Sequence, residues 1–223
     1  MPPDLSAFLT TTPQRGEATE LVTDALREAI VTGYLTAGTW LREDEVAREL
    51  NVSRTPVREA FRRLADEQLL VKTTYHGTMV APISFEDVRA LYAVRIPLEG
   101  TVAGFAAEHR SDTLVSELRT INQQMAKAAA DHDTDSMASL NRLFHRTLSD
   151  ATANLYLQRF MLQIENAARR LPSTTYSSPE RRQTVLAEHK AIIEAIEAGD
   201  AEKASRAAVL HMTRASKVRL SLL

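Results

Sequence analysis

The sequence predicts a mostly helical protein, in which an N-terminal winged helix-turn-helix is followed by an all-helical antiparallel bundle. Two observations predict this fold class. Near the N-terminus, three segments with the apolar spacing of helices precede two short strand-like segments around Gly77. Beyond residue 83, apolar residues repeat only with helical spacing. We therefore expect a mobile tail over residues 1–16, one domain over 17–82 and a second domain over 84–223.

The first domain is expected to hold three helices. Apolar residues recur at helical spacing over 17–32, and Gly33 then offers a stop. A second, short helix follows over about 43–50. Ser53 is a good N-cap for a third helix that runs to about Glu67, because its side chain can accept a hydrogen bond from a free backbone N–H.

Two short strands and a linker complete this domain. Residues 69–74 and 78–80 are typical of strands, and Tyr75-His76-Gly77 lies between them as a turn. Three helices followed by a hairpin are the components of a winged helix-turn-helix. Residues 81–83 then form a linker, which places the domain boundary near residue 83.

The second domain contains only helical apolar patterns. Ser84 and Asp87 resemble a capping box, so a helix begins there. Six segments carry apolar residues at helical spacing, and they span about 91–105, 114–125, 137–148, 154–170, 180–198 and 200–220. Short connections between six helices favour an antiparallel bundle.

The composition limits the functions that the chain can have. The formal net charge is −2, so binding to nucleic acid needs a local concentration of positive charge. No cysteine is present, which excludes thiol catalysis and zinc fingers and leaves any metal site to nitrogen and oxygen ligands. Neither a signal peptide nor a run long enough for a membrane helix is recognisable, so we expect a cytoplasmic protein without membrane contact.

The third expected helix has one apolar and one basic face. Val57, Ala60 and Leu64 mark the buried side. The opposite side carries Arg54, Thr55, Arg58 and Arg62. Arginine suits DNA recognition, because its planar fork can pair with guanine or clamp a phosphate. Alternatively, these side chains form only a solvated charged face.

The segment Val52–Leu64, together with the apolar positions before it, closely resembles the DNA-binding domain of the GntR family of bacterial regulators. The resemblance extends over about residues 17–82. It implies major-groove contacts by Arg54, Thr55 and Arg58, and minor-groove contacts at the tip of the wing by His76 and Gly77. Asp44 departs from the pattern, because some members carry a DNA-contacting arginine at this position.

Three histidines, His145, His189 and His211, lie on the core-facing sides of three different expected helices. Asn141 lies one turn before His145, so both side chains point towards the bundle interior. A lone buried histidine is usually structural, but burying several unpaired imidazoles is costly. A shared divalent metal would satisfy all three rings, and on spacing alone the metal and structural interpretations are equally favoured.

The second domain resembles the FCD ligand-binding domain of the FadR-type subgroup of GntR regulators, from about Ser84 to the C-terminus. That domain typically shows Asp-x-x-x-His and two later histidines, which are matched by Asn141, His145, His189 and His211. Arg95 and Glu99 match its Arg-x-x-Leu-Glu element. The resemblance implies a divalent metal, and three imidazoles favour a transition metal such as zinc or nickel. The neutral amide of Asn141 should bind the metal less strongly than the usual Asp does.

The two resemblances imply a DNA-binding transcription regulator and not an enzyme. We expect a repressor, with an activator as the alternative that the sequence leaves open. It would act as a homodimer on palindromic operator DNA, because a two-fold protein matches two half-sites. A small carboxylate effector would bridge the metal and Arg95. The alternative role of Arg95 is an ion pair with Glu99, one turn along the same helix.

Two other functions fit part of the pattern. A metal-dependent enzyme fused to a DNA-binding domain would need a general base, for which no motif is recognisable. Glu188 adjoins His189, but we expect it on a different side of the helix. A metal-free, acyl-CoA-type sensor is disfavoured by the three histidines, for which it has no use.

Overall fold

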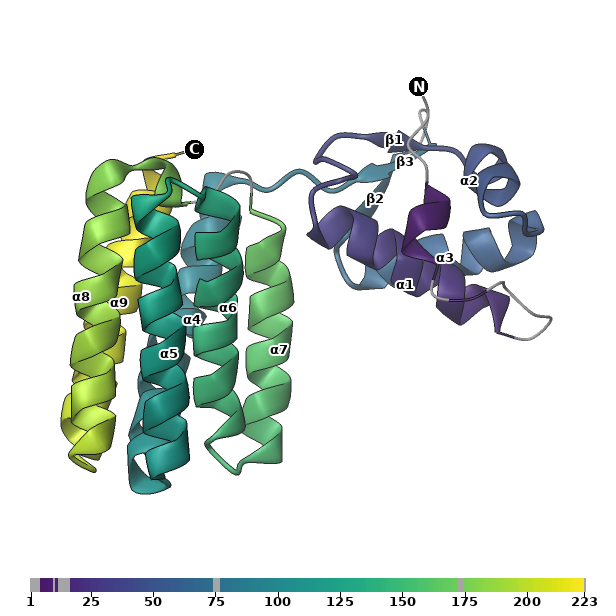
Figure 1. Ribbon diagram of the computed structural model, residues 1–223. Helices are drawn as coiled ribbons and strands as arrows, with labels where there is room; N and C mark the ends of the chain where they lie inside the picture. Colours follow the sequence, from purple (N-terminus) through teal and green to yellow (C-terminus); the bar gives the residue numbers. More distant parts are fainter. Residues whose placement is uncertain (1–4, 10, 12–16, 74–76, 172–174, 223) are drawn as a thin grey trace. The chain divides into compact units, whose positions relative to one another are not determined.

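The computed structural model describes residues 5–9, 11, 17–73, 77–171 and 175–222 (Figure 1). The chain divides into two compact units, Met1–Ile83 and Ser84–Leu223. The predicted fold class is confirmed, because the first unit holds a helix-turn-helix with a wing and the second is a helical bundle. Among the described residues, we find no helix with both the length and the apolar character that crossing a membrane requires.

The first unit combines helices with a small antiparallel sheet. Its elements are η1 (Leu5–Phe8), α1 (Ala18–Val31), β1 (Trp40–Leu41), α2 (Glu43–Glu49), α3 (Arg54–Asp66), β2 (Leu70–Thr73) and β3 (Gly77–Val80). Strand β3 lies between β1 and β2, and Met79 is the partner of Trp40 on one side and Val71 on the other. The sequence pattern does not predict β1, because two residues are too few to show the alternation of a strand.

Helix α3 packs its apolar face into the core of the first unit. Val57, Ala60 and Leu64 are fully buried, because their spacing places them on one side of the helix. Complete burial of a side chain such as Leu64 contributes about 1.5–3 kcal/mol. Asn51 has a φ of 53° in the turn before α3, a conformation that asparagine tolerates. Ser53 occupies the predicted N-cap position, but its side chain makes no capping hydrogen bond.

The segment Leu5–Phe8 packs against the rest of the first unit. Leu5 is only 1% exposed, and its backbone N–H donates to Oε1 of Glu49 at 2.6 Å. Phe8 contacts Tyr34, with 5.0 Å between the ring centroids. The expectation of a mobile tail is therefore wrong for residues 5–8. The segment Leu5–Phe8 has too few apolar residues to show the periodicity of a helix or a strand, so the sequence pattern could not predict this contact.

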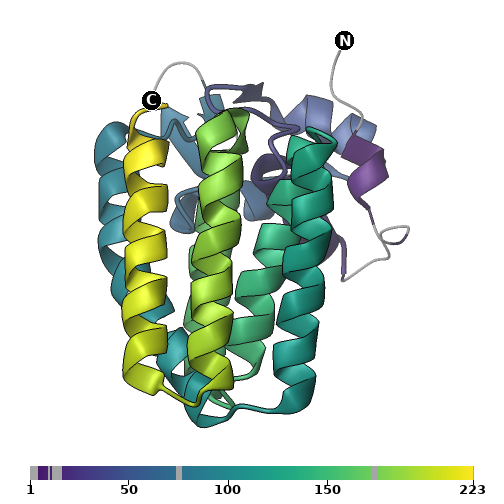
Figure 2. The same ribbon diagram turned by 60° about the vertical axis from the view of Figure 1, so that its left-hand side comes forward.

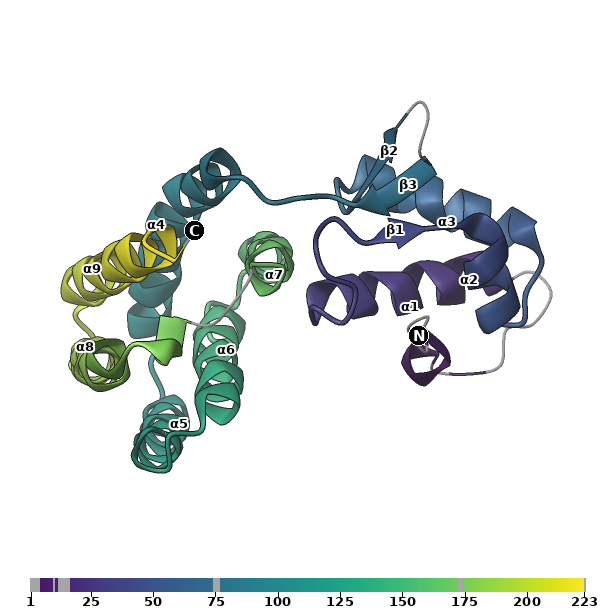
Figure 3. The same ribbon diagram turned by 90° about the horizontal axis from the view of Figure 1, so that it is seen from above.

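The second unit is a bundle of helices whose axes run alongside one another (Figures 2 and 3). Its helices are α4 (Phe85–Glu108), α5 (Asp112–Ala130), α6 (Thr134–Asp150), α7 (Leu155–Arg169), α8 (Pro179–Glu197) and α9 (Ala201–Leu220), with a short η2 (Thr175–Ser177) before α8. All of these α-helices contribute apolar side chains to one core. The six predicted helices are thus present among the described residues.

The predicted capping box at the start of α4 is also present. Ser84 Oγ accepts a hydrogen bond from the Asp87 N–H at 3.1 Å, and Oδ2 of Asp87 accepts one from the Ser84 N–H at 2.8 Å. Later helices begin with side-chain caps from Ser111, Asp133, Asn154, Ser178 and Asp200. These caps satisfy backbone N–H groups that lack a partner within the helix.

Helices α4 and α9 are in especially close contact. A Cβ atom at Gly100 would lie 2.7 Å from Cγ2 of Val209, which is shorter than side chains tolerate. The absence of a side chain at Gly100 therefore allows α9 to approach α4. This contact holds together the two helices that carry Glu99 and His211.

Candidate functional site

The basic face of α3 is exposed, as its spacing predicts. The side chains of Arg54, Arg58 and Arg62 are 62%, 67% and 66% exposed, and Thr55 is also exposed. They lie opposite the buried side of α3. Three guanidinium groups along one exposed helix face supply the local positive charge that the overall composition lacks.

An acidic side chain from α2 contacts two of these arginines. Oε2 of Glu43 lies 3.0 Å from Arg58 Nη2 and 3.4 Å from Arg54 Nη2. A hydrogen bond from Arg58 is the main reason why the pKa of Glu43 lies below its usual range. Arg62 pairs instead with Glu59, one turn earlier on the same helix, at 2.6 Å. Sequence reasoning missed the role of Glu43, because 15 positions separate it from Arg58.

The wing is described except at its tip. Residues 74–76 fall outside the described residues, so His76 has no structural description. Gly77 is the first residue of β3 and has a φ of +94°. Open space surrounds the position where a Cβ would lie, so glycine is favoured at Gly77 by the backbone conformation rather than by crowding.

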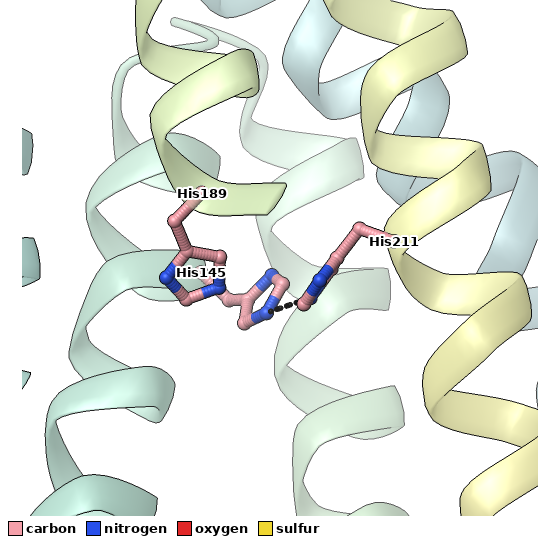
Figure 4. Close-up of side chains that lie close together, drawn as sticks. All are labelled: His145, His189 and His211. Carbon is pink, nitrogen blue, oxygen red and sulfur yellow. Dashed lines mark hydrogen bonds between the residues drawn. The ribbon is translucent and has the colours of Figure 1, made fainter. Parts of the chain in front are cut away.

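The three predicted histidines meet inside the bundle. His145 on α6, His189 on α8 and His211 on α9 are 7%, 0% and 2% exposed. A ligating nitrogen from each ring lies within 4.8 Å of those from the other two. The Nε2 atoms of His145 and His211 are 3.3 Å apart, and Figure 4 shows the three rings converging from different helices. This spacing allows one ion to contact all three rings.

Two buried carboxylates hold two of the rings by their other nitrogen. Glu99 Oε2 lies 2.8 Å from Nδ1 of His145, and Glu188 Oε2 lies 2.8 Å from Nδ1 of His211. A carboxylate accepts, so each Nδ1 carries the proton and each Nε2 keeps a lone pair for a ligand. The sequence pattern assigned Glu188 no role at the histidine site, whereas Glu188 is buried and reaches His211 on the neighbouring helix.

Two further polar groups in this region lack partners among the described residues. Neither ring nitrogen of His189 has a hydrogen bond, and the ring stacks on Phe144 with 3.9 Å between centroids and 3° between planes. Oδ1 of Asn141 is also buried without a partner. Buried polar atoms are nearly always satisfied. The unpartnered ring nitrogens of His189 and Oδ1 of Asn141 lie beside the rings of His145 and His211, and all of these atoms can ligate a divalent ion.

The ionisation of these groups also suits a metal ligand set. Burial lowers the pKa of His211 to about 4 and lowers that of His189 well below its usual value. Burial raises the pKa of Glu99, but His145 and Arg95 outweigh it and bring the pKa to about 2. At neutral pH, His189 and His211 are therefore neutral and Glu99 is charged, as metal binding and its supporting hydrogen bonds require.

A cavity of about 150 Å³ adjoins the histidines. Asn141, His145 and His211 all line it, together with Arg95. Arg95 is also paired with Glu99, since Nε donates to Oε1 at 3.0 Å. The ion pair that was the alternative role of Arg95 is thus present, and the guanidinium still lines the cavity.

Sequence reasoning missed Arg181, which also lines this cavity. Its side chain is buried, and Nη1 donates to Oε2 of Glu188 at 2.6 Å. The apolar pattern of α8 does not predict that Arg181 is buried, because Arg181 lies in the first turn of that helix.

A winged helix-turn-helix joined to a helical bundle with a buried polar centre defines a class of protein, the two-domain transcription regulators. Two family models match the chain: that of "Bacterial regulatory proteins, gntR family" over residues 18–80, and that of the "FCD domain" over residues 90–214. The chain therefore belongs to the gntR family of bacterial regulatory proteins and carries an FCD domain. It is a transcription regulator and not an enzyme.

Individual proteins agree with this assignment. The chain is 32% identical over 191 residues to the "Probable D-xylose utilization operon transcriptional repressor" of Paenarthrobacter nicotinovorans, covering 86% of this chain and 84% of that protein. It is 26% identical over 187 residues to the HTH-type transcriptional regulator YdhC of Bacillus subtilis, covering 83% and 84%. A crystal structure of a GntR regulator from Rhodococcus sp. RHA1 aligns with a TM-score of 0.73 at 25% identity, covering 92% and 98%.

Proposed function

We propose that the chain is a repressor that binds palindromic operator DNA as a homodimer, and that a small carboxylate at a metal-containing site changes its affinity for that DNA. The observation that carries the sensing part of this proposal is the convergence of His145, His189 and His211 beside a cavity. The repressor assignment is supported by the 32% identical relative, whose name describes a transcriptional repressor.

The proposed DNA interface consists of the exposed face of α3 and the wing. Arg54, Thr55, Arg58 and Arg62 project from a helix whose other face is buried, so the helix can enter a major groove without exposing the core. His76 and Gly77 are the proposed minor-groove contacts. Two copies of this interface would match the half-sites of a palindromic operator.

The proposed metal ligands are Nε2 of His145, Nε2 of His211, one ring nitrogen of His189 and Oδ1 of Asn141. Three nitrogen donors and one oxygen donor suit zinc or nickel better than magnesium or calcium. When bound, such an ion would supply a buried positive charge that attracts a carboxylate. Glu99 and Glu188 would orient the two rings through their Nδ1 atoms, as carboxylates that accept from metal-bound histidines often do.

The proposed effector is a small carboxylate that contacts the ion and Arg95. Nε of Arg95 already donates a hydrogen bond to Glu99, so the effector would contact the terminal nitrogens of the guanidinium. Arg95 lies on α4, the helix that directly follows residues 81–83. A ligand that joins α4 to the helices of the histidines can therefore favour one arrangement of the bundle over another.

The metal site is tested by elemental analysis and thermal unfolding of the purified protein, before and after chelation and after adding zinc. We expect one ion per chain and a melting temperature that falls on chelation, because an ion bound only to the folded state stabilises it. His189→Ala should lose both effects. His109→Ala, which changes an exposed histidine, is the matched control. Full metal content in His145→Ala, His189→Ala and His211→Ala would show that the histidines are only structural.

A further inference from the structure

The cavity beside the histidines carries more positive charge than one carboxylate would balance. Its described lining includes one carboxylate, that of Glu165, which is already paired with Arg146 at 3.0 Å. The same lining carries five guanidinium groups, those of Arg95, Arg142, Arg169, Arg181 and Arg219. An anionic ligand is therefore favoured, and a bound divalent ion would increase the excess of positive charge.

Two of these guanidinium groups are paired with buried carboxylates. Nε of Arg95 donates to Oε1 of Glu99 at 3.0 Å, and Nη1 of Arg181 donates to Oε2 of Glu188 at 2.6 Å. Five guanidinium groups around one cavity still outnumber these carboxylates, which favours an anion as the ligand.

Arg181 has hydrogen-bond donors that the described part of the chain does not satisfy. The side chain is 3% exposed, and only Nη1 has a carboxylate acceptor, Glu188 at 2.6 Å. Nη2 lies 3.4 Å from Nδ1 of His211, but that nitrogen already donates its proton to Glu188 at 2.8 Å and so cannot accept another. Nε is buried with no partner.

Buried N–H donors without an acceptor are costly, so a ligand group that accepts from Nε and Nη2 of Arg181 would be bound strongly. Arg95 and Arg181 line the same cavity from different helices, α4 and α8. One carboxylate held at Arg95 and the ion would leave Nε and Nη2 of Arg181 without an acceptor. A second acidic group on the same molecule would supply one.

We propose that the effector is a small dicarboxylate, with one carboxylate at Arg95 and the ion and the other at Arg181. This inference rests on the proposed effector site and specifies the class of its ligand. A cavity of about 150 Å³ suits a small acid.

The test compares acids that differ by one carboxylate, titrated calorimetrically into the zinc-loaded full chain. The pairs are butyrate with succinate, pentanoate with glutarate, and 2-hydroxybutyrate with malate. In at least one pair, the dicarboxylate should bind about tenfold more tightly or better, as expected for a hydrogen-bonded charge pair. In Arg181→Lys, the ratio of dicarboxylate affinity to monocarboxylate affinity should fall towards one.

Arg119→Lys is the matched control, because Arg119 lies on α5 in an exposed ion pair with Glu197. Zinc content and circular dichroism would verify that Arg181→Lys folds and loads the ion. No preference for any dicarboxylate, or a preference that Arg181→Lys retains, would overturn this inference and leave the effector site standing. Failure of all six acids to bind would instead overturn the proposed effector site itself.

Discussion

Single side chains from distant parts of the sequence determine the chemistry of both candidate sites. Glu43 contacts arginines on the next helix, Glu188 contacts His211 across 23 positions, and Arg181 approaches the same ring across 30. The histidines could be predicted, because each lies on the apolar stripe of its own helix. Their carboxylate and guanidinium partners could not, since such contacts depend on how helices pack and leave no local period.

At the proposed DNA interface, we predict opposite effects on DNA affinity for changing an arginine and for changing its acidic partner. Arg58→Ala should weaken binding to an operator obtained by selection from random duplexes by about tenfold or more. Glu43→Gln should strengthen binding to a random-sequence duplex by about twofold to fivefold, because its carboxylate competes with phosphate for Arg54 and Arg58. Fluorescence anisotropy measures both affinities. Equal DNA affinity in wild type, Arg58→Ala and Glu43→Gln would contradict the proposal that α3 contacts DNA.

The buried His211 predicts how stability depends on pH in the metal-free protein. Its pKa is about 4 in the folded state against an ordinary 6.5, so only the unfolded chain binds this proton between those values. Stability should therefore fall as the pH drops from 6.5 to 4, by about 3 kcal/mol for this group.

Denaturant unfolding of chelated protein at several pH values checks this expectation. The loss should be smaller in His211→Gln than in wild type, and His109→Gln, which changes an exposed histidine, is the matched control. An identical pH dependence in wild type and His211→Gln would mean that His211 does not resist protonation.

Whole helices were the easiest elements to predict, because long apolar periods and caps mark their extents. The capping box of Ser84 and Asp87 fixes the start of α4, as expected. Short elements were missed: β1 has two residues and η1 has four. Their positions follow from tertiary contacts, such as the pairing of Leu41 with Thr78, rather than from their own sequences.

The contact between α4 and α9 predicts different effects at two neighbouring glycines. A methyl group at Gly100 would meet Val209 Cγ2 at 2.7 Å and Ser205 Oγ at 3.1 Å, so Gly100→Ala should destabilise the protein by about 1–3 kcal/mol. At Gly104 the nearest atom is at 3.5 Å, and Gly104→Ala should stabilise α4 by about 0.5–1 kcal/mol. Denaturant unfolding would compare the two variants. Equal stability of the two would contradict the close contact at Gly100.

At the scale of the whole molecule, the family assignment explains why a DNA-binding unit and an FCD domain, for which we propose sensing, occur in one chain. At the first candidate site, the guanidinium groups on α3 suit binding to DNA. At the second, the histidine nitrogens in the bundle suit a metal, and the guanidinium groups around the cavity suit an anion. Regulation requires that occupation of the second site changes the affinity of the first, and the coupling must be reciprocal.

The most direct test of this coupling is operator binding by the zinc-loaded protein, measured by anisotropy with and without the acid that binds most tightly by calorimetry. We predict that this acid changes the DNA affinity by about 5-fold to 150-fold, and that chelation of the zinc or Arg95→Ala abolishes the change. The same DNA affinity at saturating acid and in its absence would contradict regulation through this site.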